Sequence, residues 1–428
     1  MIRSTKHFLL NNINSEKLSK LSEFINLYQQ SLNDCIDYIW NNKLYDQNNV
    51  LCWNIEKDIL NLPLFLDYNQ VDWKDSTLSA RCKSSILTQA IGIIKGTVGI
   101  RKHLLFKIEK RKVVGLSNDK FLKLLNKNKI SKPIVKNCFA ELSSKNIDIK
   151  KSSGFFDYWI KIRSTNLPEI KISVKLSKMD KKWINKKGVL LGGISIGKNC
   201  ISLRYEVPET KRTEGIIVGC DTGIKSPITL SNQPVLETKD NHGHTLESIQ
   251  NTLKRKKKGS KAFKKTQKHR SNYINWFVNQ LNFDNIQKVN LENVSFIGER
   301  KSRYCSHWVY GEIKERLTLK CEELGVQVSL HNAGYFSQRC SCCGLVLKSN
   351  RKGKLYKCIN CKIEIDSDLN GAKNHELELP EIPIEMRQNR SNMKGFFWKE
   401  EGIFDYIGQE RRVPDINLQK KEKDLIIK

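Results

Sequence analysis

Long hydrophobic runs are missing from this 428-residue sequence. No stretch of about 18 uninterrupted apolar residues occurs, which excludes an ordinary transmembrane helix. The start of the chain has no long apolar segment of the secretory kind, and no lipidation motif is evident. We therefore expect a cytoplasmic protein that has no membrane partner.

Acidic residues are scarce relative to basic ones. The chain carries 75 Lys and Arg against 45 Asp and Glu, a formal charge of +30. A polyanion such as nucleic acid is the natural partner of this excess, because neutralised phosphates release counterions. General overuse of Lys, Asn and Ile is the simpler explanation, but it does not account for clustering. We therefore favour nucleic acid as the partner and a nucleoid-associated location.

The basic residues cluster most densely between Lys254 and Arg270, where ten Lys or Arg occur without an acid. This run is either a solvated charged loop or a phosphate-binding surface, since it has no acids of its own for salt bridges. We favour the surface. Its expected nucleic-acid contacts are Lys254, Arg255, Lys256, Lys257, Lys258, Lys261, Lys264 and Lys265.

Isolated cysteines make up most of the 13 in the chain, which is typical of a reducing compartment. Four others form two CxxC pairs about 14 residues apart, the spacing of a closed, structural zinc ribbon. The expected zinc ligands are Cys340, Cys343, Cys358 and Cys361. Cys342 is an extra thiol, which we expect to be unligated.

The hydrophobic periodicity of residues 1–207 predicts a helical block and a β-rich block. Residues 1–10 predict a short strand, 17–42 and 78–107 predict helices, and alternating runs between 155 and 207 predict a small antiparallel β unit. We expect the first strand to pair with this unit, so the helical block is an insertion.

Beyond residue 215 the pattern predicts a layered α/β core. Strands are expected at 215–221, 228–231, 289–292 and 326–330, and a helix at 308–324. The segment 380–428 is polar and charged, and its sequence assigns no structure to it.

Three acids, Asp221, Glu292 and Asp368, stand at the ends of predicted strands or at the start of a predicted helix. A sheet can bring such positions together, and three carboxylates in one place require cations. Hard oxygen ligands select Mg²⁺ or Mn²⁺, and two such ions can support phosphodiester hydrolysis. The simpler explanations are a turn residue, a surface acid and a helix N-cap, respectively. Asp366 competes with Asp368 for the third position.

The motifs around these acids resemble those of a known family. Gly219-Cys220-Asp221-Thr222-Gly223 is similar to the first RuvC motif, Leu291-Glu292-Asn293 to the second and Asp368–Asn374 to the third, with the cysteine pairs between the last two. This order resembles TnpB, a family of transposon-encoded RNA-guided DNA endonucleases, and the related compact type V CRISPR effectors. Cys220 and Gly371 depart from the usual aliphatic residue and alanine.

The resemblance implies a multidomain α/β protein whose RNase H-like RuvC nuclease core carries an inserted zinc ribbon. A β-barrel wedge domain with an inserted helical recognition domain is implied before it. The expected parts are 1–12 with 140–212 (wedge), 13–139 (recognition), 213–335 with 364–380 (RuvC), 336–363 (zinc ribbon) and 381–428 (charged tail).

The resemblance also implies the function and the site. A guide RNA would direct cleavage of target DNA, with Asp221, Glu292 and Asp368 as the catalytic ligands of two Mg²⁺ ions. Asp368 is preferred to Asp366 because the family places its ligand directly before the asparagine-containing stretch. The alternatives are an RNA-guided repressor that does not cut, a miniature CRISPR effector, and a guide-independent resolvase or transposase. The oligomeric state stays open between monomer and dimer.

Overall fold

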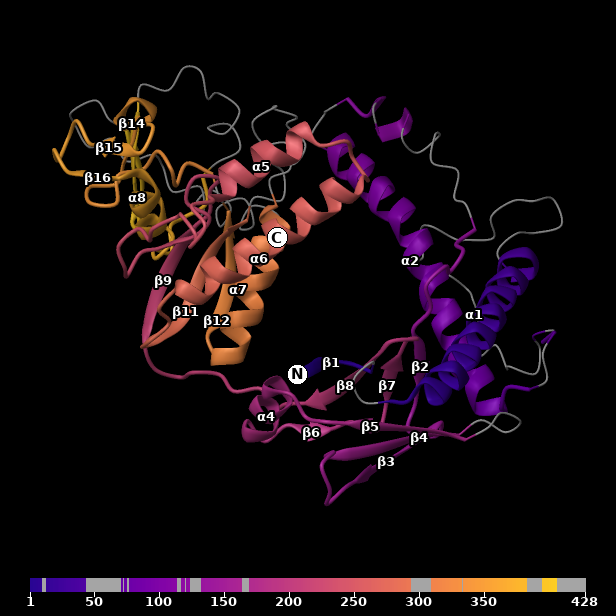
Figure 1. Cartoon of the computed structure of the whole chain (residues 1–428). Coiled ribbons are helices and arrows are strands. Elements are labelled where there is room, and N and C mark those ends of the chain that lie inside the picture. The colour runs from indigo at the N-terminus through magenta and orange to yellow at the C-terminus, as the bar shows by residue number, and fades with distance from the viewer. Residues whose placement is uncertain are drawn as a thin grey trace, which may run out of the picture. The chain divides into compact units, whose positions relative to one another are not determined.

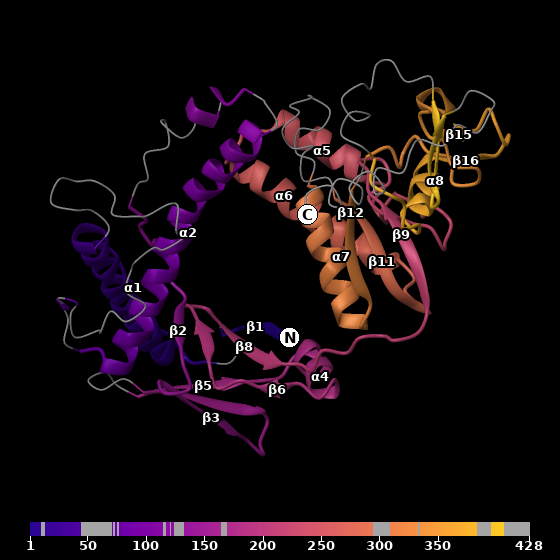
Figure 2. The same ribbon diagram turned by 180° about the vertical axis from the view of Figure 1, so that it is seen from behind.

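The computed structural model describes residues 1–9, 13–43, 71, 73–74, 77–113, 117–119, 121–123, 132–163, 169–293, 309–332, 334–382 and 395–405. The chain divides into two compact units, Met1–Pro208 and Glu209–Lys428. Both units contain helices and sheets (Figures 1 and 2), so the predicted mixed α/β character is confirmed. Among the described helices, none combines the length and the apolar character that a membrane crossing needs.

Two antiparallel sheets and a pair of long helices build the first unit. One sheet has the order β1-β8-β7-β2, with β6 also paired to β8, and the other has the order β3-β4-β5. The strands are β1 (Ile2–Phe8), β2 (Ala140–Leu142), β3 (Ile147–Lys151), β4 (Tyr158–Ile162), β5 (Ile170–Val174), β6 (Val189–Leu190), β7 (Ile194–Ile196) and β8 (Cys200–Glu206). The expected pairing of the N-terminal strand with this unit is confirmed, since β1 pairs with β8 along its whole length.

Helices α1 (Ser15–Lys43) and α2 (Ala80–Val113) pack against each other and against these sheets (Figures 1 and 2). Their shared core contains Phe24 and Ile36 of α1 and Ile86 and Ile94 of α2, all fully buried. Both helices begin and end within a few residues of the periodic patterns that predicted them, because apolar residues at helical spacing need a surface to cover.

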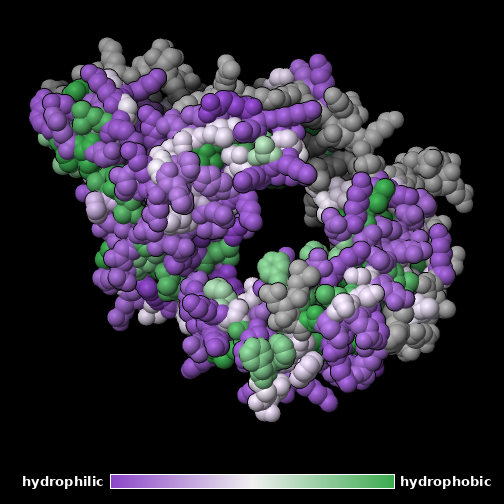
Figure 3. Space-filling model, viewed as in Figure 1, coloured by the Kyte–Doolittle hydropathy of each residue, from purple (hydrophilic) through white to green (hydrophobic). Residues whose placement is uncertain are grey.

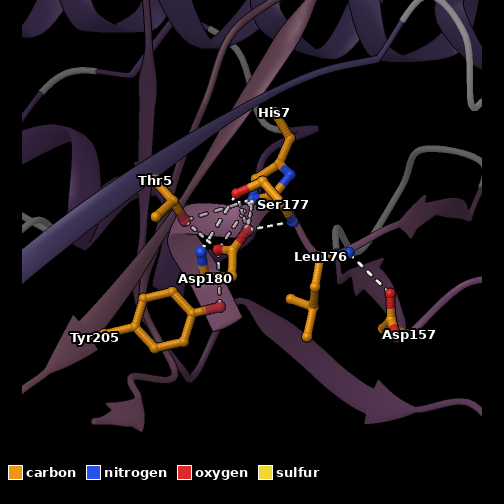
Figure 4. Close-up of polar contacts among 7 residues, drawn as sticks. All are labelled: Thr5, His7, Asp157, Leu176, Ser177, Asp180 and Tyr205. Carbon is orange, nitrogen blue, oxygen red and sulfur yellow. Dashed lines mark hydrogen bonds and ion pairs between the residues drawn. The ribbon is translucent and has the colours of Figure 1, made fainter. Parts of the chain in front are cut away.

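The short helix α4 (Lys178–Asn185) carries a buried carboxylate that joins three elements of the first unit. Asp180 accepts hydrogen bonds from Thr5 and His7 of β1, from Tyr205 of β8 at 2.9 Å and from the Ser177 N–H at 2.6 Å (Figure 4). Although burial opposes ionisation, the hydrogen bonds from His7, Ser177 and Thr5 hold the pKa of Asp180 below its usual value. These hydrogen bonds explain why two polar side chains of β1, Thr5 and His7, are buried.

The second unit is built on a four-stranded sheet of order β10-β9-β11-β12. Strands β9 (Ile216–Asp221), β11 (Ile286–Asn293) and β12 (Gln327–Asn332) are parallel, and β10 (Thr229–Leu230) runs antiparallel to β9. Because side chains alternate along a strand, Val218 and Cys220 face one side of the sheet while Gly219 and Asp221 face the other.

The apolar face of this sheet is covered by α5 (Leu246–Arg255), α6 (Lys261–Gln280) and α7 (Tyr310–Leu324), as Figure 1 shows. Their core includes Ile249, Phe277 and Leu317, packed with Val289 and Leu291 of β11. The short helix α8 (Ser367–Asn374) contacts β9 and β10 on the opposite face. That opposite face carries the polar side chains of the sheet.

Two small sheets connect α7 and β12 to α8 and to the C-terminal region. One has the order β14-β15-β16, and the other has the order β13-β17-β18. The elements are β13 (Leu345–Val346), the 3₁₀ turn η3 (Lys348–Asn350), β14 (Arg351–Lys352), β15 (Leu355–Lys357), β16 (Glu364–Asp366), β17 (Phe396–Lys399) and β18 (Gly402–Asp405). Part of the segment predicted as a charged tail therefore forms a hairpin. The remainder of 383–428 lies outside the described residues, as does Trp308, the first residue of the helix predicted at 308–324.

Candidate functional site: carboxylates, a histidine and a cysteine cluster

Two of the predicted acids meet on the polar face of the second sheet. Asp221 ends β9 and Glu292 lies near the end of β11, and the two strands pair in parallel with Leu291 opposite Cys220. A carboxylate oxygen of each and a ring nitrogen of His375 all lie within 4.8 Å of one another. Sequence positions about 70 to 150 residues apart are thus joined by strand register and by helix α8.

Glu292 is oriented by the turn that follows β9. The Thr222 N–H donates to Glu292 Oε1 at 3.2 Å, and the Thr222 hydroxyl donates to the same oxygen at 2.5 Å. The Tyr310 hydroxyl of α7 donates to the Glu292 main-chain carbonyl. One carboxylate oxygen is therefore fixed by Thr222, which leaves the other oxygen of this buried side chain for a further ligand.

The two carboxylates repel each other. Burial, the charge of Glu292 and the charge of Asp368 raise the pKa of Asp221 well above its usual value. Burial also raises the pKa of Glu292, although hydrogen bonds from Thr222 oppose the shift. Carboxyl groups in this state gain from a nearby cation, because a cation removes both the repulsion and part of the desolvation penalty.

Helix α8 approaches the sheet closely because glycines stand at the contact. A Cβ atom at Gly219 of β9 would lie 1.8 Å from the Ala372 carbonyl oxygen. A Cβ atom at Gly371 of α8 would lie 3.2 Å from the Asp221 carboxyl carbon. Gly371, one of the two departures from the family pattern, therefore relieves crowding against Asp221.

Asp368 lies in the first turn of α8, beside the group formed by Asp221, Glu292 and His375 but not within it. Its carboxylate is held by Lys354 and by Arg351, the latter at 3.3 Å, both from the β14–β15 region. Asp366 is the N-cap of α8 and accepts from the Asp368 N–H at 2.8 Å. The N-cap role considered for Asp368 thus belongs to Asp366.

These oxygen ligands fit a hard divalent cation such as Mg²⁺. Asp221 and Glu292 supply one oxygen each at the shared point, and Asp368 is close enough for its charge to raise the pKa of both. The buried repulsion between these carboxylates is itself the observation that supports a cation.

His375 was not among the residues predicted from the sequence. It caps the C-terminus of α8, it is 1% exposed, and burial together with His331 lowers its pKa to about 3. It lies seven residues after Asp368, which is two helical turns, so both side chains fall on one face of α8. That spacing is the signal in the sequence that could have identified it.

The four predicted zinc ligands come together in the second unit. The Sγ atoms of Cys340 and Cys361 are 3.5 Å apart, and those of Cys343 and Cys358 are 3.6 Å apart. A zinc ion about 2.3 Å from four tetrahedral thiolates would separate the sulfurs by about 3.8 Å. The cluster therefore fits structural zinc, and Cys342 is exposed and outside it.

Both cysteine pairs have the same backbone geometry. The Gly344 N–H donates to the Cys340 carbonyl at 2.9 Å, and the Lys362 N–H donates to the Cys358 carbonyl at 3.0 Å. Gly344 and Lys362 both have positive φ, at 80° and 64°. The two turns thus present their thiols in equivalent ways. Although burial of the Cys361 thiol opposes the shift, hydrogen bonds from the Ile363 N–H and from neighbouring thiols lower the pKa of Cys361 to about 7.

The cysteine cluster is tied directly to α8. The Ser341 N–H donates to Asn370 Oδ1 at 2.9 Å, and Asn370 and Asn374 each donate to the Arg339 carbonyl at 2.7 Å. The Arg339 guanidinium donates to Asn374 Oδ1 at 2.6 Å. Asn370 and Asn374 are one helical turn apart, so together they fix the orientation of the helix that carries Asp368.

The basic run 254–270 occupies the end of α5, the following turn and the first half of α6, not a loop. Its residues Lys256, Lys257, Lys258, Lys261, Lys264 and Lys265 are exposed, and none forms an ion pair with an acid in the part of the chain that the structure describes. Arg270 differs, because it is buried and lies 3.6 Å from Glu312 of α7. The surface over α6 is largely hydrophilic (Figure 3).

A separate open cavity of about 1090 Å³ lies in the first unit, between α2, the β2–β3 turn and the β6–β7 loop. Arg81, Lys145 and Arg204 line it together with serines 84, 85, 143 and 144. Arg204 is paired with Glu141. Glu141 is the one acid among the described residues of the lining, and the basic and hydroxyl groups suit a phosphate-bearing ligand.

Residues 310–375 match the family model described as Cas12f1-like, TNB domain. The sequence is 32% identical over 121 residues to the CRISPR-associated endodeoxyribonuclease Cas12f1 of Sulfoacidibacillus thermotolerans, covering 28% of each chain. It is 26% identical over 136 residues to that of Syntrophomonas palmitatica, covering 31% of this chain and 27% of the relative. The aligned segments thus span less than a third of either relative.

Two solved structures resemble the fold over most of the chain. The Cas12f1–sgRNA–target DNA complex aligns with a TM-score of 0.50 and 15% identity over 85% of this chain and 82% of its own. CasPhi-2 (Cas12j) bound to crRNA aligns with a TM-score of 0.52 and 9% identity over 89% and 99%, respectively. At these identities the likeness shows the fold alone, the mixed α/β fold of these Cas12f1 and Cas12j structures.

Proposed function

We propose that this protein is an RNA-guided DNA endonuclease with an RNase H-like RuvC core, in which Asp221, Glu292 and Asp368 hold two Mg²⁺ ions. The observation that carries the proposal is the meeting of Asp221 and Glu292 on one sheet face, beneath the helix that bears Asp368. The parallel β9, β11 and β12 with antiparallel β10 are compatible with such a core.

Divalent ions at these carboxylates would activate a water and neutralise charge on the leaving oxygen. The residues of the chain supply the geometry. Thr222 fixes one oxygen of Glu292, and Gly371 lets α8 lie against Asp221. Asn370 and Asn374 hold α8 to the cysteine cluster, so zinc there would act on the reaction by positioning Asp368.

The charge distribution supports nucleic acid as partner and substrate. The exposed lysines of α5 and α6 offer phosphate contacts in the second unit, and Arg81 and Lys145 offer others in the first. The solved Cas12f1 relative contains sgRNA and target DNA, which are the partner classes that we assign to this chain.

The finer assignment concerns the biological role. We propose a transposon-associated nuclease of the TnpB kind. We also propose the five-part domain division expected from the sequence. A miniature type V CRISPR effector is the second candidate, because the matched relatives are Cas12f1 proteins. Sequencing the RNA that co-purifies with the full chain separates them. RNA transcribed from the 3′ end of the gene itself would support the first, and repeat-spacer RNA the second.

Cleavage is tested with Asp221→Ala. The variant, loaded with its RNA, is expected to cut target DNA at least about a hundredfold more slowly while binding it normally. Asp284→Ala, which removes an exposed acid of the same unit, is the matched control. If Asp221→Ala cuts target DNA as fast as the wild type, the proposed function is contradicted. If the wild type binds target DNA but does not cut it, the repressor is favoured.

A further inference from the structure

His375 is a buried imidazole with an unsatisfied nitrogen at the proposed catalytic site. Its side chain is 1% exposed, and Nδ1 has no hydrogen-bond partner among the described residues. Buried polar nitrogens almost always have a partner, so the orphaned atom needs an explanation. A structural core histidine would normally satisfy this nitrogen.

The position of the ring is well determined by its surroundings. It stacks on Phe336 with 4.4 Å between ring centroids and 21° between planes. The Asn290 amide of β11 donates to the His375 carbonyl at 2.9 Å, which fixes the backbone. Gly219 and Gly371 allow the helix to bring this ring down to the sheet. The imidazole is thus held in place before any ligand arrives.

The ring of His375 lies close to two carboxylates. One nitrogen of His375 and one oxygen each of Asp221 and Glu292 lie within 4.8 Å of one another. Ligands about 2.1 Å from a shared octahedral ion lie about 3 to 4 Å apart, so only small side-chain rotations are needed.

We infer that His375 is a nitrogen ligand of a divalent cation at Asp221 and Glu292, and that it makes the site prefer Mn²⁺ to Mg²⁺. Imidazole binds first-row transition metals well, whereas Mg²⁺ prefers oxygen. This inference rests on the proposed function, because it concerns the same carboxylates. The protein ligands of this cation would then be one nitrogen and two oxygens instead of oxygens alone.

The first test measures metal affinity by calorimetry on the zinc-loaded full chain without nucleic acid. His375→Leu is expected to weaken Mn²⁺ binding at least about tenfold, the effect that even an outer-shell partner of a ligand has. Mg²⁺ affinity should change by less than about threefold. His331→Leu is the matched control, since it removes a half-buried imidazole of β12 that lies outside the ligand group.

The second test detects the ligand directly. Pulsed electron paramagnetic resonance of bound Mn²⁺ should show coupling to an imidazole ¹⁴N in the wild type and in His331→Leu, and no coupling in His375→Leu. Mn²⁺ should also raise the melting temperature of the wild type more than that of His375→Leu. Without added Mn²⁺ or Mg²⁺, His375→Leu should melt no lower than the wild type, because it removes an orphaned polar group.

Equal Mn²⁺ affinity of wild type and His375→Leu, or the absence of ¹⁴N coupling in the wild type, would overturn the inference. Failure of the inference is distinguishable from failure of the proposed function. If only the inference fails, Asp221→Ala still abolishes cutting while His375→Leu binds Mn²⁺ normally. If the proposed function fails, either Asp221→Ala continues to cut or the wild type itself does not cut.

Discussion

Gly219 of β9 lies so close to Ala372 of α8 that a Cβ atom at position 219 would stand 1.8 Å from the Ala372 carbonyl oxygen. Helix α8 therefore packs directly against the backbone of β9 at Gly219, with no side chain between them. Any side chain between them would lift α8 away from the sheet, and Asp368 and His375 would move with it.

Gly219→Ala is therefore expected to lower the free energy of unfolding by about 3 kcal/mol and to abolish cutting. Chemical denaturation and a cleavage assay check this. Gly96→Ala in α2, where a Cβ atom would meet nothing within 4 Å, is the matched control and should be neutral or stabilising by up to about 1 kcal/mol. Equal effects of the two substitutions would contradict the close-contact explanation.

Asp221→Asn should stabilise the protein at neutral pH when no Mg²⁺ or Mn²⁺ is added. The raised pKa of Asp221 means that the native state binds more protons than the unfolded state above about pH 4, so its stability falls as pH rises. A neutral amide removes that loss. The free energies of unfolding of wild type and variant should therefore diverge as pH rises above about 4. If the stability of the two proteins changes with pH in the same way, burial and neighbouring charges do not raise the pKa of Asp221.

Cys358→Ser should remove zinc and with it the proposed cutting activity. The four thiolates form a closed site, so losing one should reduce bound zinc from one ion per chain to nearly none. Loss of cutting should follow because Asn370 and Asn374 attach α8 to this cluster. Cys342→Ser, which alters an exposed thiol outside the cluster, should keep both zinc and activity. Elemental analysis and a cleavage assay distinguish the two variants.

Replacing Lys256, Lys257 and Lys258 by Gln should weaken nucleic-acid binding in a salt-dependent way. If all three contact phosphates, the slope of log affinity against log salt should fall in magnitude by about 2 to 3. The control removes the same charge at three exposed lysines of the first unit, Lys178, Lys181 and Lys187. Equal slopes for the two triple variants would mean that only net charge matters.

Asp180→Asn should destabilise the first unit by about 3 kcal/mol, because five hydrogen bonds from four residues converge on this buried carboxylate. Since its folded pKa is depressed, the stabilisation is present above about pH 4 and is lost as pH falls through the folded pKa. Wild type and variant should therefore converge at low pH in denaturation experiments. Asp148→Asn, at an exposed ion pair, should have a much smaller effect.

Strand and helix positions could be predicted because their periodicity is strong. The strand expected at 215–221 is β9 at Ile216–Asp221, and the helix expected at 308–324 is α7 from Tyr310 to Leu324. The sequence did not show that the basic run spans the end of one helix, a short turn and the start of another. Composition alone does not distinguish a solvated loop from the exposed face of a helix.

The site could be predicted only in part. Strand ends marked Asp221 and Glu292, but the roles of His375, Thr222 and Lys354 depend on which elements pack together, and one sequence does not reveal that. The division of labour between Asp366 and Asp368 depends on where α8 begins, a boundary that local sequence defines poorly. The hairpin of β17 and β18 was missed because its partner strand lies about 50 residues away.

That hairpin limits how far the chain can be shortened. The Trp398 carbonyl accepts from the Arg339 guanidinium at 2.8 Å, and the Trp398 N–H donates to the Gly344 carbonyl at 2.9 Å. A truncated form ending at Ile382 would leave Arg339 without this acceptor next to the first cysteine turn. Efforts to miniaturise the protein should therefore keep residues 395–405 or replace them with another strand.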